Sequence, residues 1–243
     1  YAARKFGIHS AMSAQKAFDL CPEAIFIPPR MSHYKIVSQQ IRGIFARYTD
    51  LIEPLSLDEA YLDVTKNKWN LSSATVIAKK IQREVWQETG LTCSAGVSYN
   101  KFIAKIASDF RKPAGMTVIT PNDAARFLRE LPIEKFYGVG KKTVEKMKLL
   151  GIHSGDDLYL FDQSELLSQF GKHGYILYQR VRGIDNRPVE PERERKSIGK
   201  EHTFTLFLFF LEQVRLELKQ IALAVQVALH NNKLHGRSVV LKI

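Results

Sequence analysis

The stretch LIEPLSLDEAYLDV, residues 51–64, decides the fold class of this 243-residue sequence. Its apolar residues alternate as they do in strands, with Leu55 and Leu57 on one parity and Leu62 and Val64 on the other. An acidic pair lies between these two apolar runs. We therefore expect a β-hairpin whose turn lies near the acidic pair.

Helical patterns surround this hairpin in the sequence. Apolar residues at helical spacing predict helices over residues 34–48, 72–88 and 101–110, and LTCSAGVS (residues 91–98) predicts a buried strand. The first thirty residues are expected to form a small helical segment that ends in a proline-rich loop. This order predicts an α+β fold, in which helices pack on a small antiparallel sheet.

The pattern changes after residue 120. Residues 121–183 contain short helical patterns separated by glycines, and residues 186–197, NRPVEPERERKS, are typical of a linker. A strand over residues 202–209, a long amphipathic helix over 211–232 and a strand over 238–243 are expected next. Because two strands and one helix do not make a stable sheet domain, we expect this last domain to be cut off.

Composition narrows the class of protein. With 45% hydrophobic and 25% charged residues the chain has the composition of an ordinary globular protein. The longest apolar run, residues 206–211, is far too short to span a bilayer, so no membrane association is expected. Cys21 and Cys93 have no metal-ligand spacing around them, which fits thiols in a reducing cytoplasm.

The net charge of +11 indicates a polyanionic partner. Basic residues are spread along the chain and are not confined to a tail, as suits a surface that follows a nucleic-acid backbone. Charge alone leaves this open, because many basic proteins bind no nucleic acid.

The acidic pair Asp58 and Glu59 is the first candidate site. Adjacent side chains of a straight strand point to opposite faces, but at a hairpin turn both can project toward one point. Gathered carboxylates repel unless a cation such as Mg²⁺ neutralises them. The alternative is an ordinary solvated turn, since a metal site normally needs another carboxylate. Asp63 lies further along the strand and is expected to be structural or exposed.

Arg4 and Lys112 are candidate phosphate ligands. A guanidinium suits bidentate contact with phosphate, and a lysine supplies a mobile point charge. Lys112 lies in the segment RKPAG, between an expected helix and a proline, where function often resides. Taken singly, each residue is more typical of a surface cation. The sequence contains no Walker-type phosphate loop.

The segment FYGVGKKT, residues 136–143, has the form of a helix–hairpin–helix DNA-binding turn. Glycines such as Gly138 and Gly140 let the backbone approach a phosphate, and the next helix presents its first N–H groups to the anion. Lys141 and Lys142 add positive charge there. Such contacts hold DNA without reading its sequence. A glycine-rich connection without a ligand is the alternative.

These segments resemble, in order, the motifs of the Y-family translesion DNA polymerases of the DinB (DNA polymerase IV) branch. The matching segments cover nearly the whole chain: YAARKFGI, SLDEAYLDV, SAGVSYNKFIAKIASD, RKPAGMTVI, FYGVGKKTVEKMKLLGI and RKSIGKEHTF.

The resemblance implies a division into the domains of that family. Residues 1–29 would be part of the fingers, 30–119 the palm without its first strand, 120–183 the thumb with the helix–hairpin–helix, 184–196 a linker, and 197–243 part of the little finger.

The resemblance also implies roles for the candidate residues. Asp58 corresponds to a Mg²⁺ ligand, and Glu59 to the adjacent catalytic carboxylate, which can also bind metal. The residues that would hold the incoming triphosphate are Tyr1, Arg4 and Lys112. Those that would contact the duplex backbone are Gly138, Gly140 and Lys141.

The implied function is DNA-directed DNA synthesis past damaged template, in which two Mg²⁺ ions assist transfer of deoxynucleotides to a primer 3′ end. Primer-template DNA, deoxynucleoside triphosphates and a sliding clamp are the implied partners of a cytoplasmic monomer. The clamp-binding tail would follow residue 243.

The family's first metal-binding aspartate and its steric gate would precede Tyr1. For this reason we expect residues 1–243 alone to be inactive. Two other functions stay open: a non-catalytic DNA-binding relative and a palm-type nucleotide cyclase. Retention of the acidic pair argues against the first, and the DNA-binding turn argues against the second.

Overall fold

The computed structural model describes residues 1–192, 194–204 and 207–242. Its contacts divide the chain into two units, Tyr1–Pro191 and Glu192–Ile243, each of which is described by itself. No helix in the described ranges is both long enough and apolar enough to cross a membrane.

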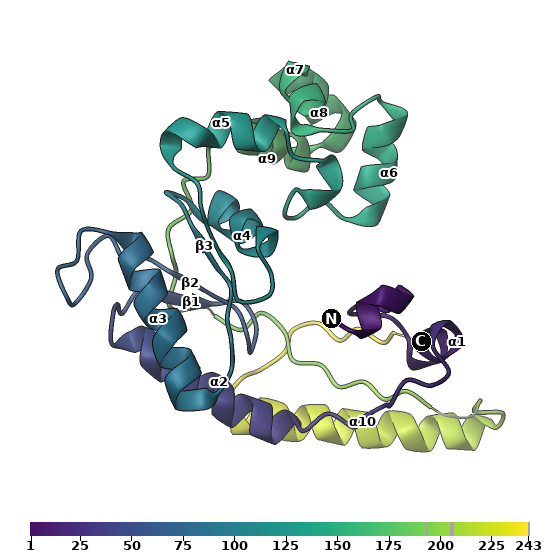
Figure 1. Ribbon diagram of the computed structural model, residues 1–243. Helices are drawn as coiled ribbons and strands as arrows, with labels where there is room; N and C mark the ends of the chain where they lie inside the picture. The colour runs from purple at the N-terminus through teal and green to yellow at the C-terminus, as the bar shows by residue number, and fades with distance from the viewer. Residues whose placement is uncertain (193, 205–206, 243) are drawn as a thin grey trace. The chain divides into compact units, whose positions relative to one another are not determined.

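The first unit mixes helices with two small sheets (Figure 1). Its elements in chain order are the 3₁₀ helix η1 (Ala3–Phe6), α1 (Ala14–Leu20), α2 (Met31–Ala46), β1 (Ile52–Pro54), β2 (Ala60–Leu62), α3 (Ala74–Thr89), β3 (Ala95–Val97), α4 (Lys101–Phe110), β4 (Met116–Val118), α5 (Pro121–Arg129), the 3₁₀ helix η2 (Ile133–Lys135), α6 (Lys141–Leu149), α7 (Gly155–Leu160), α8 (Gln163–Phe170) and α9 (Lys172–Val181).

The expected hairpin is present. Strands β1 and β2 pair antiparallel, with Glu53 opposite Tyr61, and the acidic pair lies in the turn between them. The expected α+β class is confirmed, with one difference in the sheets. The strand expected in residues 91–98 is the short, half-buried β3, and it pairs with β4 in parallel. The two strands run the same way because α4 carries the chain back between them.

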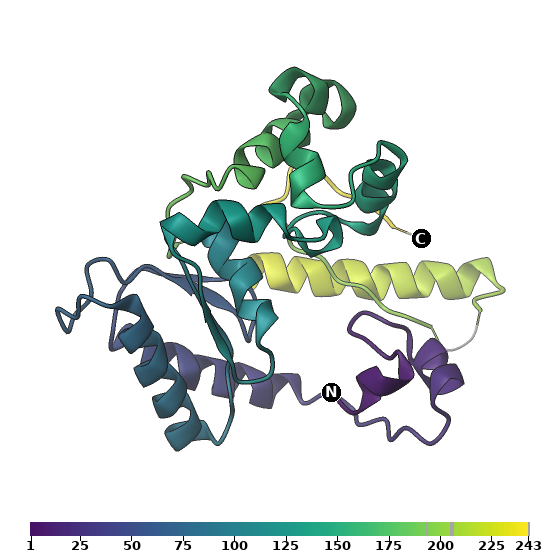
Figure 2. The same ribbon diagram turned by 45° about the horizontal axis from the view of Figure 1, so that its top comes forward.

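Two hydrophobic clusters hold the unit together. The smaller cluster joins α2 to α3 around Ile44, Tyr48 and Ile77. The larger cluster joins one face of α4, including Phe102, to the helices α5–α9. Figures 1 and 2 show the strands between the α2–α3 pair and α4. Helix α4 therefore belongs both to the sheet layer and to the core of the following helices.

Gly96 explains how closely α4 lies on the sheet. A Cβ atom at this position of β3 would stand 1.9 Å from the carbonyl oxygen of Ala104 and 2.5 Å from the backbone nitrogen of Ser108. Only glycine allows this approach of strand and helix. Asn100 begins the helix by accepting a hydrogen bond from the Ile103 N–H at 2.9 Å. Strand β3 and this cap together set where the side chains of α4 point.

The second unit contains α10 (Leu211–Asn231), which matches the expected long helix. The strands expected over 202–209 and 238–243 are wrong for the residues that the structure describes there, namely 202–204, 207–209 and 238–242. Apolar alternation predicts a strand only where a neighbouring strand supplies hydrogen-bond partners, and these segments do not pair with each other. Residues 205, 206 and 243 lie outside the described ranges.

The segment expected to be a linker forms neither helix nor strand in residues 186–192 and 194–197. Its beginning is nevertheless attached to the first unit. The backbone N–H of Glu190 donates to the Glu53 carboxylate at 2.9 Å, and the Asp185 carboxylate accepts from the Phe102 N–H at 3.0 Å.

Candidate active site

A cavity of about 460 Å³ opens beside the β1–β2 turn. Among the residues that line it are two acids, Asp58 and Glu59, and two lysines, Lys105 and Lys112, together with Tyr1. These residues come from the chain start, the hairpin turn, α4 and the loop after α4. The fold therefore brings opposite charges from distant parts of the sequence to one hollow.

The hairpin turn is held by hydrogen bonds on both sides of the acidic pair. The backbone N–H groups of Leu55 and Ser56 both donate to the Glu59 carbonyl, at 2.9 and 3.3 Å. The Ser56 hydroxyl donates to the Asp58 carboxylate at 2.6 Å. From α2, Arg42 donates to the Ser56 carbonyl at 2.9 Å. These contacts order the turn that carries both carboxylates.

Lys105 is the main site residue that the sequence interpretation missed. Its ammonium lies 2.8 Å from a Glu59 carboxylate oxygen, and its side chain is only 13% exposed. The same ammonium lies 5.7 Å from the ring centroid of Tyr137. Tyr137 belongs to the segment FYGVGKKT, residues 136–143, which we call the glycine turn. The sequence did contain a signal for Lys105, because Lys101 and Lys105 are one helical turn apart and therefore lie on the same face of α4.

Lys112 lines the cavity and forms an ion pair with a neighbouring aspartate. Its ammonium pairs with Asp109 at 2.5 Å, and this hydrogen bond raises the pKa of Lys112 above its ordinary value. The charges of Glu59 and Tyr1 act in the same direction. A permanently charged lysine beside the acidic turn can bind a phosphate group of a ligand in the cavity.

Arg4 is not among the residues that line this cavity. It lies in η1, where it is exposed, whereas Tyr1 reaches the cavity. The structure therefore brings Tyr1 and Lys112 together with the acidic pair at the cavity, whereas Arg4 lies next to Tyr1, to whose carbonyl its backbone N–H donates at 3.1 Å, without lining the cavity.

The acidic pair supplies only part of a metal-binding set. Within residues 1–192, 194–204 and 207–242 no group of three or more acidic, histidine or cysteine side chains is placed to hold a metal ion. Mg²⁺ in nucleotide-binding enzymes often takes one or two protein carboxylates and completes its shell with water and substrate phosphates. Asp58 and Glu59 fit that partial role.

The glycine turn precedes α6 and exposes backbone donors. Gly138 has φ of +90°, a conformation that favours glycine. Within the described part of the chain, no acceptor is found for a run of N–H groups at this turn and at the start of α6, those of Gly138, Gly140, Lys141 and Lys142. Unpaired N–H groups at a turn and a helix start form a binding site for an anion.

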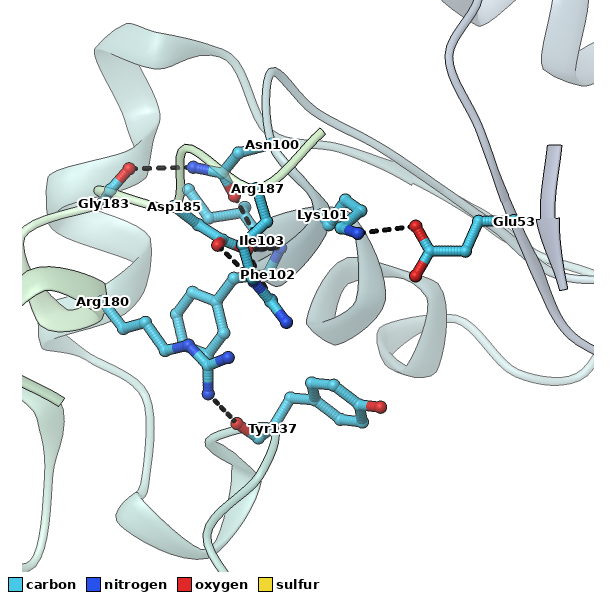
Figure 3. A network of polar contacts seen from close by, with 10 residues as sticks. All are labelled: Glu53, Asn100, Lys101, Phe102, Ile103, Tyr137, Arg180, Gly183, Asp185 and Arg187. Atoms are coloured by element: carbon cyan, nitrogen blue, oxygen red, sulfur yellow. Dashed lines mark hydrogen bonds and ion pairs between the residues drawn. The ribbon is translucent and has the colours of Figure 1, made fainter. Parts of the chain in front are cut away.

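A polar network joins α4 to the chain segment after α9 (Figure 3). We call it the α4–α9 joint and define it by Asn100, Phe102, Arg180, Gly183 and Asp185. The Asn100 amide donates to the Gly183 carbonyl at 2.8 Å. The Asp185 carboxylate, which accepts from the Phe102 N–H, has a side chain only 5% exposed.

The two carboxylates in and beside this joint, those of Asp185 and Glu53, each have a basic partner. Burial raises the pKa of Asp185, but hydrogen bonds and charge from Arg187, at 2.6 and 2.7 Å, outweigh it and leave the pKa below its ordinary value. Beside the joint, burial likewise opposes ionisation of Glu53. The 2.6 Å pair with Lys101 and the bond from Glu190 lower the pKa of Glu53 overall.

Comparisons with known proteins identify the family of the chain. Residues 1–109 match the model of the impB/mucB/samB family, and residues 121–152 match the IMS family HHH motif. DNA polymerase IV of Listeria monocytogenes is 56% identical over the whole chain, which spans 68% of that protein.

Two solved structures share the fold. A Y-family DNA polymerase chimera has a TM-score of 0.83 at 33% identity and aligns with 93% of this chain and 66% of its own. An insertion ternary complex of Dbh DNA polymerase has a TM-score of 0.71 at 35% identity and aligns with 78% of this chain and 56% of its own.

The fold, the helix–hairpin–helix match and these relatives define the class as DNA-directed DNA polymerase. Within that class, the chain belongs to the DinB-type Y family.

Proposed function

We propose that the protein is a translesion DNA polymerase that adds deoxynucleotides to a primer 3′ end by Mg²⁺-dependent nucleotidyl transfer. The observation that carries this proposal is the cavity in which Asp58 and Glu59 face Lys105, Lys112 and Tyr1. Two carboxylates beside fixed cations suit a substrate that brings both a metal ion and a triphosphate.

In this proposal each side chain of the cavity has one task. Asp58 and Glu59 hold Mg²⁺, which when bound lowers the barrier to attack by the primer hydroxyl and stabilises the leaving pyrophosphate. Lys112 and Tyr1 bind the triphosphate at the cavity wall, and Arg4 approaches it from η1. Two metal ions are proposed for the complete enzyme.

In this proposal the glycine turn binds the second substrate, primer-template DNA. The free N–H groups around Gly138, Gly140 and Lys141 bind phosphates of the primer-template duplex without reading its bases. The insertion ternary complex of Dbh DNA polymerase supports a site that takes DNA and nucleotide together. We further propose a monomer in the cytoplasm that reaches a sliding clamp through residues outside this chain.

Primer extension by the full-length protein tests the proposal. We expect deoxynucleotide addition that depends on Mg²⁺, stops when EDTA is added, and continues opposite an abasic template site. A protein that binds primer-template DNA and adds no nucleotide under any divalent cation would contradict it. Such a result would favour the non-catalytic DNA-binding relative. The same assay on residues 1–243 alone tests the expectation that this segment is inactive.

A further inference from the structure

Arg180, near the end of α9, contacts the glycine turn directly. Its guanidinium donates a hydrogen bond to the Tyr137 carbonyl at 3.2 Å (Figure 3). The guanidinium carbon also lies 5.0 Å from the ring centroid of Phe102, in the first turn of α4. Arg180 therefore connects the turn that carries the free N–H groups to the helix that presents Lys105 to the cavity.

The bond to Tyr137 determines which way the next N–H group points. In a trans peptide the C=O and N–H bonds point in opposite directions. The Tyr137–Gly138 peptide is not among the cis bonds of the described chain. With its C=O held by Arg180, the Gly138 N–H points away from the Arg180 guanidinium, and it has no acceptor among the described residues.

The surroundings of Arg180 disfavour the charged form of its guanidinium. Burial and the neighbouring charge of Arg187 lower the pKa of the Arg180 guanidinium. Within the described residues it forms no ion pair, because Asp185 is paired with Arg187. The Tyr137 carbonyl, the Phe102 ring and the nearby charge of Asp185 compensate for this. A half-buried arginine whose main hydrogen bond goes to one carbonyl is placed to hold that carbonyl.

The α4–α9 joint holds in place the end of α9, which carries Arg180. The Gly183 carbonyl accepts hydrogen bonds from the Asn100 amide and, at 3.0 Å, from the Tyr99 hydroxyl. Asp185 caps the start of α4 through the Phe102 N–H. The end of α9 and the residues that follow it are thus tied to the start of α4 at Gly183 and at Asp185.

We propose that Arg180 is a positioning residue for DNA binding: it fixes the Tyr137–Gly138 peptide so that the Gly138 N–H faces the DNA backbone, and itself makes no phosphate contact. The inference rests on the proposed function, since it assigns to that function a residue that acts through the glycine turn.

The test uses the full-length protein and two matched arginines. Arg182 follows Arg180 on the same helix end, stacks on the Tyr178 ring at 3.6 Å and donates to the Tyr159 carbonyl at 2.9 Å, away from the glycine turn. We would compare Arg180→Met, Arg180→Lys and Arg182→Met. The readouts are the dissociation constant for primer-template DNA over a range of salt, and kcat and nucleotide KM at saturating DNA.

For Arg180→Met we expect the dissociation constant to rise about tenfold, as when a charge-assisted hydrogen bond is lost. The slope of its logarithm against log salt, kcat and nucleotide KM should stay unchanged. Arg180→Lys should recover part of the affinity because it keeps a donor. Arg182→Met should stay within about twofold of the wild type.

Several results would overturn the proposal. A salt slope lowered by about 0.9 would make Arg180 itself a phosphate ligand. Unchanged affinity in Arg180→Met, or equal losses in Arg182→Met, would show that the turn does not depend on this contact. If Arg180→Met does not fold, Arg180→Lys decides by affinity alone: a dissociation constant equal to that of the wild type would overturn the proposal. Failure of the wild type to bind primer-template DNA would instead contradict the proposed function.

Discussion

The β1–β2 turn and the glycine turn before α6 solve different binding problems with different parts of the chain. The β1–β2 turn presents side chains: two carboxylates at a cavity with the Lys105 ammonium on one of them. The glycine turn presents main-chain N–H groups, and its best-placed residue, Gly138, has no side chain at all.

This difference predicts how each turn responds to amino-acid substitution. A side-chain site depends on residue type, so an isosteric substitution that removes charge should abolish its function while the backbone stays in place. A main-chain site depends on conformation, so charge matters less than whether the backbone can keep its φ angle. Of the four predictions below, ordered from the largest expected effect to the smallest, three separate the two dependences, and Lys101→Met tests the ion pair that ties α4 to β1 of the hairpin.

Asp58→Asn in the full-length protein should lower the primer-extension rate about a thousandfold, because a neutral amide binds Mg²⁺ poorly. Affinity for primer-template DNA should change less than about threefold. Stopped-flow nucleotide addition and fluorescence anisotropy measure the two quantities. Asp63→Asn is the matched control, since Asp63 caps the Thr65 N–H and does not line the cavity. Equal losses in both variants would remove Asp58 from the proposed metal site.

Lys101→Met should destabilise the first unit by about 3 kcal/mol, because it leaves Glu53 of β1 without its buried partner. The pKa of Glu53 is lowered in the folded state, so the pair stabilises the fold above the unfolded-state pKa of about 4.3. That contribution is lost as the pH falls through the folded-state pKa. Thermal unfolding of both proteins at pH 7 and at about pH 4 should therefore show a smaller difference at low pH.

Lys68→Met is the control for Lys101→Met. Lys68 pairs with Asp50 on the surface, where both side chains are well exposed, and such pairs add little stability. An equal shift of the unfolding midpoint in the two variants would show that burial does not distinguish the two pairs.

Gly138→Ala should weaken binding to primer-template DNA about tenfold, since a positive φ costs a residue with a Cβ about 1–2 kcal/mol. The added Cβ would also stand 3.0 Å from Arg180. The kcat at saturating DNA should not change. Gly151→Ala is matched to it, because Gly151 has φ of +77° and open space around it but lies after α6, outside the glycine turn. Similar loss of affinity in Gly151→Ala would mean that the stability of the helices α5–α9, and not the turn, governs binding.

Lys105→Met should tighten Mg²⁺ binding in the absence of nucleotide by about threefold, because it removes a competing cation from a partly exposed Glu59. The increase of the unfolding midpoint on adding Mg²⁺ should be correspondingly larger than in the wild type. Calorimetric titration with Mg²⁺ measures this effect. Weaker Mg²⁺ binding in the variant would show that Lys105 organises the carboxylates more than it competes with the ion.

Local patterns were sufficient for most of the elements. The hairpin around the acidic pair and the helices α2, α3, α4 and α10 follow from apolar spacing, with boundaries that differ from expectation by a few residues. The strands expected after residue 197 were wrong in the described ranges, because alternation alone does not supply a pairing partner. The parallel pairing of β3 with β4 likewise depends on where the chain goes between them.

The sequence predicted the acidic residues of the candidate site, but only some of its basic residues. Asp58 and Glu59 are adjacent in the sequence, so their proximity needs no long-range information. Lys105 was missed because its pairing with Glu59 spans 46 residues. Arg4 and Tyr1 are near neighbours in the sequence, yet only Tyr1 lines the cavity.

The sequence by itself determined the family motifs, the acidic hairpin turn and the glycine turn, because each is a run of adjacent residues whose local geometry follows from residue type. Tertiary structure alone decided that Lys105 and Lys112 meet the acidic pair at one cavity. It also decided that Arg180 reaches the Tyr137 carbonyl across 43 residues. The physical reason is that ion pairs and side-chain hydrogen bonds act over a few ångströms in space, and only packing brings distant segments that close.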